Sequence, residues 1–315
     1  MRKLLLSAAV AAAFASPVTI STAQAQAAAA PASPHTFTGN MTIGSDYRFR
    51  GVSQTFNGPT IQGGVDYSHA SGFYVGNWNS NVSGLTFNNG NNIEMDFYGG
   101  WKGSWGDWGL DVGNLYYYYD SARWNGGSLT PAARGVSVAN NSGKYNNNEV
   151  YIAGSWKWLS AKYSYSTTDY FGMNGALARN TNSKDSFIAG GALGAPAAGA
   201  AGAGNRAGLL AATNEDRGSS KGSGYFQIDA SYEFAPKWTV IGHVGKLSVK
   251  NYSELNYTDV KVGVTYDLGG WILGAAAVGT NANKQWYSGQ RTVAGGNQAK
   301  DLGTTTLVLT VAKTF

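Results

Sequence analysis

Apolar and polar residues alternate along most of the chain. Within 92–103, for example, Ile93 and Phe97 share one face, whereas Glu94 and Asp96 share the other. A period of two with one apolar face is typical of a β-strand whose two sides meet different surroundings. The pattern predicts about twelve strands. They lie at 37–50, 60–69, 72–82, 92–103, 106–119, 146–158, 160–170, 223–234, 237–249, 257–268, 271–281 and 303–315.

The last of these segments runs to the final residue. Counting back in twos from Phe315, the residues Val311, Leu309 and Leu307 lie on one face, and mostly small polar residues lie on the other. A terminal strand that closes on an aromatic residue is typical of bacterial outer-membrane barrels, whose apolar face meets lipid. We therefore interpret Phe315 as an assembly signal. Lys313 shares the apolar face, where we expect its long side chain to reach the headgroups.

The connections between the predicted strands alternate between short and long. Short ones lie near residues 70–71, 104–105, 159, 235–236 and 269–270. Long ones lie near 51–59, 83–91, 120–145, 171–222, 250–256 and 282–302. Barrels inserted from the periplasm have short periplasmic turns and long outer loops, whereas Greek-key sandwiches do not sort loop lengths in this way. The sequence therefore predicts an all-β fold, a transmembrane antiparallel up-and-down β-barrel.

The N-terminal segment has the features of a secretory signal peptide. Two basic residues precede an apolar run at 4–15, and Ala23 and Ala25 form a small-x-small cleavage site. These are the parts of a signal peptide, and the run is too short to cross a bilayer as a helix. We expect cleavage after Ala25. A short periplasmic segment at 26–35 and a single barrel domain at 36–315 would remain.

Composition narrows the class of protein further. The chain has no cysteine, so disulfides do not hold it together. Its 10 tryptophans and 19 tyrosines suit the aromatic girdles of a membrane barrel. The formal net charge of +5 comes from scattered basic residues, without a run that would indicate nucleic-acid binding. Six tryptophans near the short connections are candidates for a girdle at the periplasmic interface: Trp105, Trp108, Trp156, Trp158, Trp238 and Trp271.

One segment carries a resemblance to a known family. Residues 45–55 read Ser-Asp-Tyr-Arg-Phe-Arg-Gly-Val-Ser-Gln-Thr, and 66–69 and 71–76 read Asp-Tyr-Ser-His and Ser-Gly-Phe-Tyr-Val-Gly. Together they resemble the opening of the TorF-type porin family, bacterial outer-membrane proteins formerly of unknown function. The resemblance implies an outer-membrane barrel with a channel role. It supplies neither a substrate nor catalytic residues.

The polar faces of the predicted strands carry the candidate pore-lining residues. The acidic ones are Asp46, Asp66, Glu94, Asp96, Asp111, Glu149, Asp229, Glu233, Asp259 and Asp267. The basic ones are Arg48, Arg50, Lys102, Lys157, Lys162 and Lys261. An excess of carboxylates favours cations, so we predict passive diffusion of small hydrophilic solutes with a weak preference for cations or neutral solutes. Asp46 and Arg48 are equally consistent with solute contact and with a structural pair that braces the wall.

The connection at 171–222 leaves two interpretations open. Its part at 186–212 is rich in glycine and alanine, which is typical of a flexible loop. Long barrel loops also fold back into the lumen in some proteins. The sequence favours a flexible outer loop, and a constriction of the lumen is the alternative.

Enzyme chemistry finds little support in the sequence. Histidine occurs only at His35, His69 and His243, and the alternation points His243 toward the lumen, whereas a lipid-acting barrel enzyme needs Ser and His on the lipid side. No spacing suggests a metal or cofactor site. Two alternatives to a channel remain: a non-conducting surface barrel whose long outer loops bind partners and, with less support, an enzyme acting on outer-membrane lipid. The expected surroundings are outer-membrane lipid and lipopolysaccharide, the barrel-assembly machinery and small hydrophilic solutes; the oligomeric state stays open.

Overall fold

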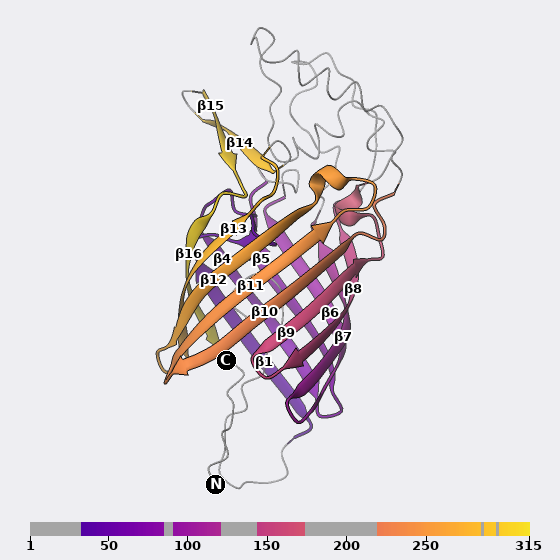
Figure 1. The fold of residues 1–315 in the computed structure, drawn as a ribbon, viewed down its shortest axis with the longest axis vertical. Helices are drawn as coiled ribbons and strands as arrows, with labels where there is room; N and C mark the ends of the chain where they lie inside the picture. Colours follow the sequence, from indigo (N-terminus) through magenta and orange to yellow (C-terminus); the bar gives the residue numbers. More distant parts are fainter. Residues whose placement is uncertain (1–32, 85–90, 121–143, 174–218, 285–286, 294–295) are drawn as a thin grey trace.

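The strands close into one antiparallel barrel (Figure 1). The structure is a computed structural model that describes residues 33–84, 91–120, 144–173, 219–284, 287–293 and 296–315. Every wall strand pairs with its neighbours in the chain, and the first and last close the ring. The wall strands are β1 (His35–Gly44), β4 (Thr60–His69), β5 (Phe73–Asn81), β6 (Ile93–Trp105), β7 (Trp108–Tyr118), β8 (Asn147–Trp156), β9 (Leu159–Ser166), β10 (Gly224–Ala235), β11 (Trp238–Ser248), β12 (Tyr257–Asp267), β13 (Trp271–Thr280) and β16 (Thr306–Thr314).

The remaining described elements are short and lie at the end of the barrel that carries the long connections, here called the long-loop end. Two of them, β14 and β15, form a hairpin that projects beyond the rim (Figure 1). These elements are β2 (Arg48–Phe49), β3 (Val52–Ser53), β14 (Ser288–Val293), β15 (Gly296–Asp301) and the 3-10 helices η2 (Tyr170–Gly172) and η3 (Ser253–Leu255). The opposite end, where tight turns join the strands, is called the short-turn end.

The predicted barrel and its twelve strands are confirmed, with one clear difference. The first strand was expected to run to residue 50, but β1 ends at Gly44. The alternation in the sequence continues past Gly44, because charged and aromatic residues alternate from Asp46 to Arg50. The chain has nevertheless already left the wall there. Arg50 adopts a left-handed backbone conformation with φ 47°, which no strand accommodates.

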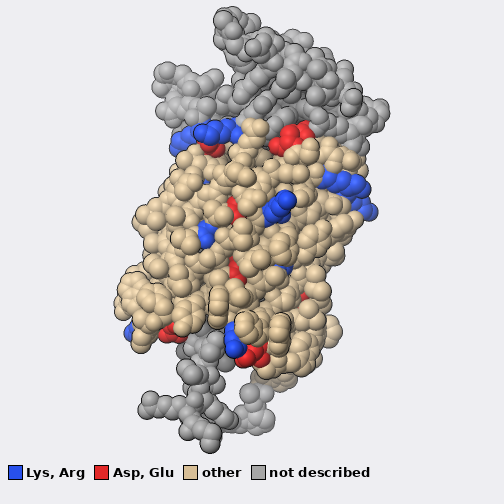
Figure 2. Space-filling model, viewed as in Figure 1, with Lys and Arg blue, Asp and Glu red and all other residues tan. Residues whose placement is uncertain are grey.

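The outer face of the barrel is apolar. Phe37, Val262 and Leu307 are 76, 65 and 62% exposed, although they are large hydrophobic residues. Figure 2 shows a face that is mostly uncharged, with charged side chains near both ends of the barrel and a few between them. The six candidate girdle tryptophans are 39–63% exposed and lie beside the short turns. Among the described residues, no helix is long and apolar enough to cross a membrane.

Lys313 lies on this apolar face at the short-turn end. Its Nζ is 4.7 Å from the ring centroid of Trp271, its partner on the neighbouring strand, and 5.3 Å from that of Phe315. Stacking over aromatic faces gives the ammonium a favourable contact while its stem stays on the apolar wall. The cross-strand geometry therefore accommodates a charge at this position.

Burial inside the lumen changes along the barrel axis. On β6, the inward residues Glu94 and Asp96 are 0 and 1% exposed, whereas Lys102 is half-buried. On β10, Tyr225 is buried at the long-loop end, and Glu233 is exposed at the other. The core of the molecule thus fills the long-loop half of the lumen. Its tyrosines are Tyr47, Tyr98, Tyr117, Tyr119, Tyr145, Tyr170, Tyr225, Tyr252, Tyr257 and Tyr287.

Candidate functional site

The connection between β1 and β4, residues 45–59, folds into the lumen, and we call it the plug loop. Gly44 and Thr60, which flank it, are direct partners across the two strands. The loop therefore leaves and re-enters the wall at one point. Within it, β2 and β3 pair Arg48 with Ser53 as a small hairpin. Residues 46–56 are buried apart from Phe49, which is half-buried.

Asp46 organises the loop from within. Its carboxylate accepts hydrogen bonds from Arg48 Nε at 2.5 Å, Ser53 Oγ at 2.7 Å and Thr55 Oγ1 at 2.8 Å. Arg48 Nη1 also donates to the carbonyl oxygens of Leu302 at 2.8 Å and Thr304 at 3.1 Å. Of the two interpretations left open by the sequence, these contacts favour the structural pair. It braces the loop against the segment before β16.

Arg50 fixes the tip of the loop to the far wall. Its Nη2 donates to both carboxylate oxygens of Glu149 on β8, at 3.0 and 2.7 Å. The guanidinium also lies over the Tyr225 ring on β10, 4.2 Å from its centroid, and donates to the Tyr170 hydroxyl at 3.2 Å. Arg50 and Glu149 are only 6 and 2% exposed. A desolvated pair with this geometry is costly to break from one side.

Two further contacts complete the crossing of the lumen. The Tyr47 hydroxyl donates to Glu94 Oε1 at 2.8 Å on β6, and the Tyr47 ring packs edge-on against Trp78. Burial, together with the charge of Glu94, raises the pKa of Tyr47 well above its ordinary value, so the hydroxyl remains a donor. On the other side, Gly51 has φ 80°, and a Cβ there would lie 2.6 Å from Cβ of Asp259 on β12. The plug loop thus touches β6, β8, β10 and β12.

Tyrosines paired with carboxylates line the lumen from the buried core toward the short-turn end. The Tyr98 hydroxyl donates to Asp66 at 2.5 Å, and the Tyr74 hydroxyl donates to Asp111 at 2.6 Å. Tyr151 bonds to Tyr74 through their hydroxyls. Two lysines lie over these rings: Lys162 Nζ is 4.0 Å from the Tyr151 centroid and Lys102 Nζ is 5.3 Å from the Tyr74 centroid. This wall carries both charge signs and aromatic faces, with Lys162 buried and Lys102 half-buried.

His243 lies on the opposite wall, on β11, between two carboxylates. Its Nδ1 is 2.7 Å from Asp229 Oδ1, and its Nε2 is 2.9 Å from Asp259 Oδ2. Gln227 donates to the other oxygen of Asp229, and Tyr225 donates to the other oxygen of Asp259. Both ring nitrogens face carboxylates, which is the arrangement of a structural network.

Most of the predicted pore-lining residues lie on the lumen side, but their surroundings differ. Lys157 is the exception: it lies in the β8–β9 turn with φ 54°, 3.8 Å from Asp107 and over the outward Trp156 ring, so its predicted inward direction is wrong. The tight turn breaks the alternation there.

The other predicted residues have three kinds of surroundings. Glu233 and Asp267 accept backbone N–H groups of short turns at the rim. Those that are buried are Asp46, Arg48, Arg50, Glu94, Asp96, Glu149, Lys162 and Asp259. Those half-buried toward the short-turn end are Asp66, Lys102, Asp111, Asp229 and Lys261.

The plug itself was not predicted. The sequence placed a constriction, as the alternative, at 186–212, which lies outside the described residues, as does the expected signal peptide. A signal was present nearer the N-terminus: Asn57, Gly58 and Pro59 are turn residues that separate 45–56 from the next strand. The partners of the loop, by contrast, lie up to 256 residues away in the chain. Local alternation carries no information on such contacts.

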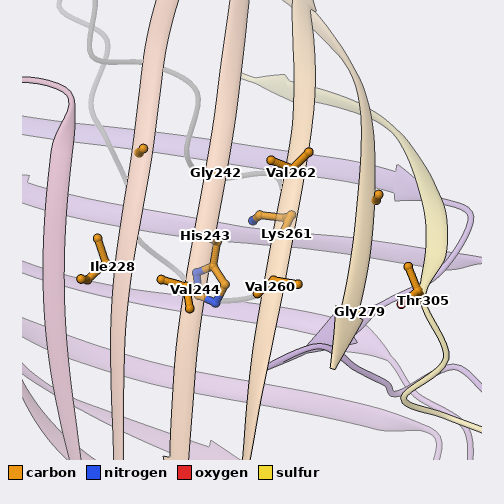
Figure 3. A pocket seen from close by; sticks show the side chains of 11 residues that line it. Ile228, Gly242, His243, Val244, Val260, Lys261, Val262, Gly279 and Thr305 are labelled. Carbon is orange, nitrogen blue, oxygen red and sulfur yellow. The ribbon is translucent and has the colours of Figure 1, made fainter. Parts of the chain in front are cut away.

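A groove of about 540 Å³ lies on the outside of the barrel, over β10 to β13. Exposed apolar side chains line it, including Ile228, Val244 and Val262, and Gly242 and Gly279 leave room between them (Figure 3). It is part of the apolar outer face. Among the described residues, no group of three or more His, Asp or Glu side chains is arranged to hold a metal ion.

The sequence matches one protein family over residues 28–315, described as a bacterial protein of unknown function (Gcw_chp). The chain belongs to this family. The match spans the whole barrel, including the plug loop. No curated protein matches the sequence. The likeness to TorF-type porins remains a prediction for this Gcw_chp protein.

Solved structures similar to this Gcw_chp chain include two porins. A KdgM porin, solved in complex with disordered oligogalacturonate, is 8% identical with a TM-score of 0.44, and the match covers 89% of this chain and 99% of that one. A porin refined at 1.8 Å resolution is 10% identical with a TM-score of 0.35, covering 89% and 100%. OccAB4 of Acinetobacter baumannii is 12% identical with a TM-score of 0.34, covering 85% and 57%. At these identities and TM-scores the matches say nothing about what passes through this lumen.

Proposed function

We propose that this Gcw_chp protein is an outer-membrane channel for small hydrophilic solutes, narrowed at its long-loop end by the plug loop. The observation that carries the proposal is a closed barrel with an apolar outer face and a charged lumen that becomes more exposed toward the short-turn end. An apolar exterior suits lipid, and a polar interior suits water and solutes. Twelve strands leave more internal space than the side-chain-filled eight-strand case.

The charge pattern supports weak selectivity. In the half-buried part of the lumen, Asp66, Asp111 and Asp229 are balanced by Lys102 and Lys261, with His243 between carboxylates. Most of the remaining carboxylates are engaged in the buried network or in short turns at the rim. A pore with nearly balanced accessible charge discriminates little between ions. We therefore propose a weak preference for cations or neutral solutes.

The proposed location follows from the same features. The tryptophans beside the short turns suit an interfacial girdle, which would place those turns at the periplasmic side. Export through a signal peptide cleaved after Ala25, assembly guided by Phe315, and contact with lipopolysaccharide at the long-loop end are parts of this proposal.

A non-conducting surface barrel is the second candidate. The observation that favours it is the dense packing of the long-loop half, where Arg50, Glu149 and Glu94 are almost fully buried. If the plug loop stays in place, solutes would have no wide path. An enzyme acting on lipid has less support, because His243 faces the lumen and both its nitrogens face carboxylates.

Planar-bilayer recordings under a KCl gradient test the proposal. Purified, refolded protein is expected to give discrete conductance steps of small amplitude, with a reversal potential near zero or slightly toward cations. A clear anion preference would contradict the proposed selectivity. Failure to conduct at any voltage, for protein whose folding is verified by its heat-modifiable mobility, would instead support the non-conducting barrel.

A further inference from the structure

Two lysines lie on the outward face of the wall strands, and their surroundings differ. Lys313, at the short-turn end, lies over aromatic rings. Lys246 lies on β11 near the long-loop end and is exposed. Its cross-strand partners are Phe226 on β10 and Thr258 on β12, neither of which carries a charge. Among the described residues, no carboxylate forms an ion pair with Lys246.

The height of Lys246 on the wall matches the outer edge of an apolar band. It lies eight residues after Trp238, one of the candidate girdle tryptophans at the short-turn end. A strand rises about 3.4 Å per residue and tilts by about 35–45°, which places Lys246 about 20 Å from that girdle along the barrel axis. The apolar band of an outer-membrane barrel is about 25 Å tall. The long side chain of Lys246 can therefore extend to the lipid headgroups at the long-loop end.

The groove on the outside of the barrel begins one outward row from this lysine, on the side of the short turns. Val244, the next outward residue on β11, and Val260 on β12 line it, and Gly242 leaves room between the apolar side chains (Figure 3). Outward residues two apart on a strand lie about 7 Å apart, which an extended lysine side chain can span. An acyl chain in the groove would therefore bring its own headgroup to Lys246.

A second lysine lies at the rim beyond Lys246. Lys250 is exposed, and a Cβ on Gly222 would lie 3.4 Å from its Cδ. The same Cβ would lie 3.3 Å from the hydroxyl oxygen of Tyr165, which is 40% exposed on the outward face of β9. Lys250 and Tyr165 thus lie together on the outer side of the rim. Tyrosine is a residue that membrane proteins place at the headgroup level.

We propose that this face of the barrel binds a lipopolysaccharide molecule, with an acyl chain in the groove and a lipid A phosphate on Lys246. The site rests on the proposed outer-membrane function, which places the long-loop end in the outer leaflet. The apolar lining suits an acyl chain, and an unpaired ammonium attracts an anionic headgroup. Lipid A carries both several acyl chains and more than one phosphate, so Lys250 is available to a further phosphate.

This surface suits an anionic lipid better than a second copy of the barrel. The alternation places no carboxylate on the outward face of the described wall strands. A second copy would therefore offer no counter-charge to Lys246 from those strands, whereas a phosphate supplies it.

Native mass spectrometry of the full-length mature protein tests the site, with lipid A and phosphatidylglycerol present in equal amounts in the detergent. The wild type is expected to retain one lipid A per chain in preference to phosphatidylglycerol. Lys246→Met should weaken this retention about fivefold, which is the effect of one lysine near an anionic lipid surface. Lys313→Met removes the outward lysine at the other end and is the matched control, which should bind like the wild type.

A second pair of variants tests the groove. A Cβ on Gly242 would lie 3.8 Å from Cβ of Ala230, an ordinary contact, so Gly242→Leu fits the wall and fills the groove. It is expected to weaken the retention of lipid A. The matched control is Gly154→Leu on the outward face of β8, where a Cβ would meet nothing within 4 Å.

Several results would overturn the proposal. They are equal retention of lipid A by the wild type and Lys246→Met, equal retention of lipid A whose phosphates have been removed, and equal retention of phosphatidylglycerol. A lipid-free dimer that Gly242→Leu abolishes would show that a second copy occupies the groove instead. None of these results depends on conductance, so a barrel that does not conduct would leave this site standing, and loss of the site would leave the channel standing.

Discussion

Arg50 connects the plug loop to the wall more firmly than any other charged residue for which contacts are described. It combines hydrogen bonds from Nη2 to both carboxylate oxygens of Glu149 with stacking over Tyr225 in a region that excludes water. Its left-handed backbone, at φ 47°, carries some strain that these contacts must offset. The residue is therefore where the closed arrangement of the lumen is most easily disturbed.

Removing either partner of this pair is expected to destabilise the folded protein by about 3–5 kcal/mol, because it leaves a buried charge without its counter-charge. Glu149→Gln and Arg50→Met should each lower the denaturant midpoint in urea titrations of the refolded barrel. The matched control is Lys157→Met, which removes an exposed ion pair with Asp107 and is expected to cost at most about 1 kcal/mol. Equal effects at the two sites would show that the buried pair does not hold the loop.

At the residue scale, the sequence showed which side chains point inward but not what they meet. Asp46, Arg48 and Arg50 were read as strand residues because they alternate with Tyr47 and Phe49. The contacts that draw them out of the wall come from Glu149, 99 residues away, and from carbonyl oxygens more than 250 residues away. Such partners are set by barrel closure, which no local pattern encodes.

The strands are the elements that the sequence predicted well. Each wall strand separates an apolar surface from a polar lumen, so the period of two is strong in all of them. On β12, Val260, Val262 and Val264 face outward while Asp259 and Lys261 face inward. The first strand was overextended for the same reason, since charged and aromatic residues also alternate at the start of the plug loop.

A charged side chain on the outer face should destabilise the folded barrel more, the deeper the side chain lies in the membrane. Val262 lies at the middle of β12 and is 65% exposed, so Val262→Lys is expected to cost about 2–4 kcal/mol of folding free energy in lipid vesicles. Ile93 faces outward at the long-loop end of β6, and Ile93→Lys should cost only about 0–1 kcal/mol. Urea titration of the vesicle-bound barrels measures both. A Val262→Lys barrel as stable as the Ile93→Lys barrel would contradict a lipid-facing outer surface.

The whole molecule combines a closed barrel with a plug made from its own first loop. The wall does not need that loop for closure, because Gly44 and Thr60 already pair across β1 and β4. Instead, its fifteen residues fill the lumen at the long-loop end, while the short-turn half remains more exposed. The fold class followed from the alternating connection lengths. That the plug loop fills one end of the lumen could be learned only from the three-dimensional contacts of that loop.

The most direct test of this account compares single-channel conductance with and without the plug loop. Replacing residues 45–59 with Asn-Gly, a turn that joins two paired strands directly, keeps the Gly44–Thr60 pairing and removes the plug loop. The account predicts small or intermittent steps for the wild type and steps several-fold larger for the shortened barrel in the same planar bilayers. Equal conductance in the two folded proteins, or none in either, would contradict it.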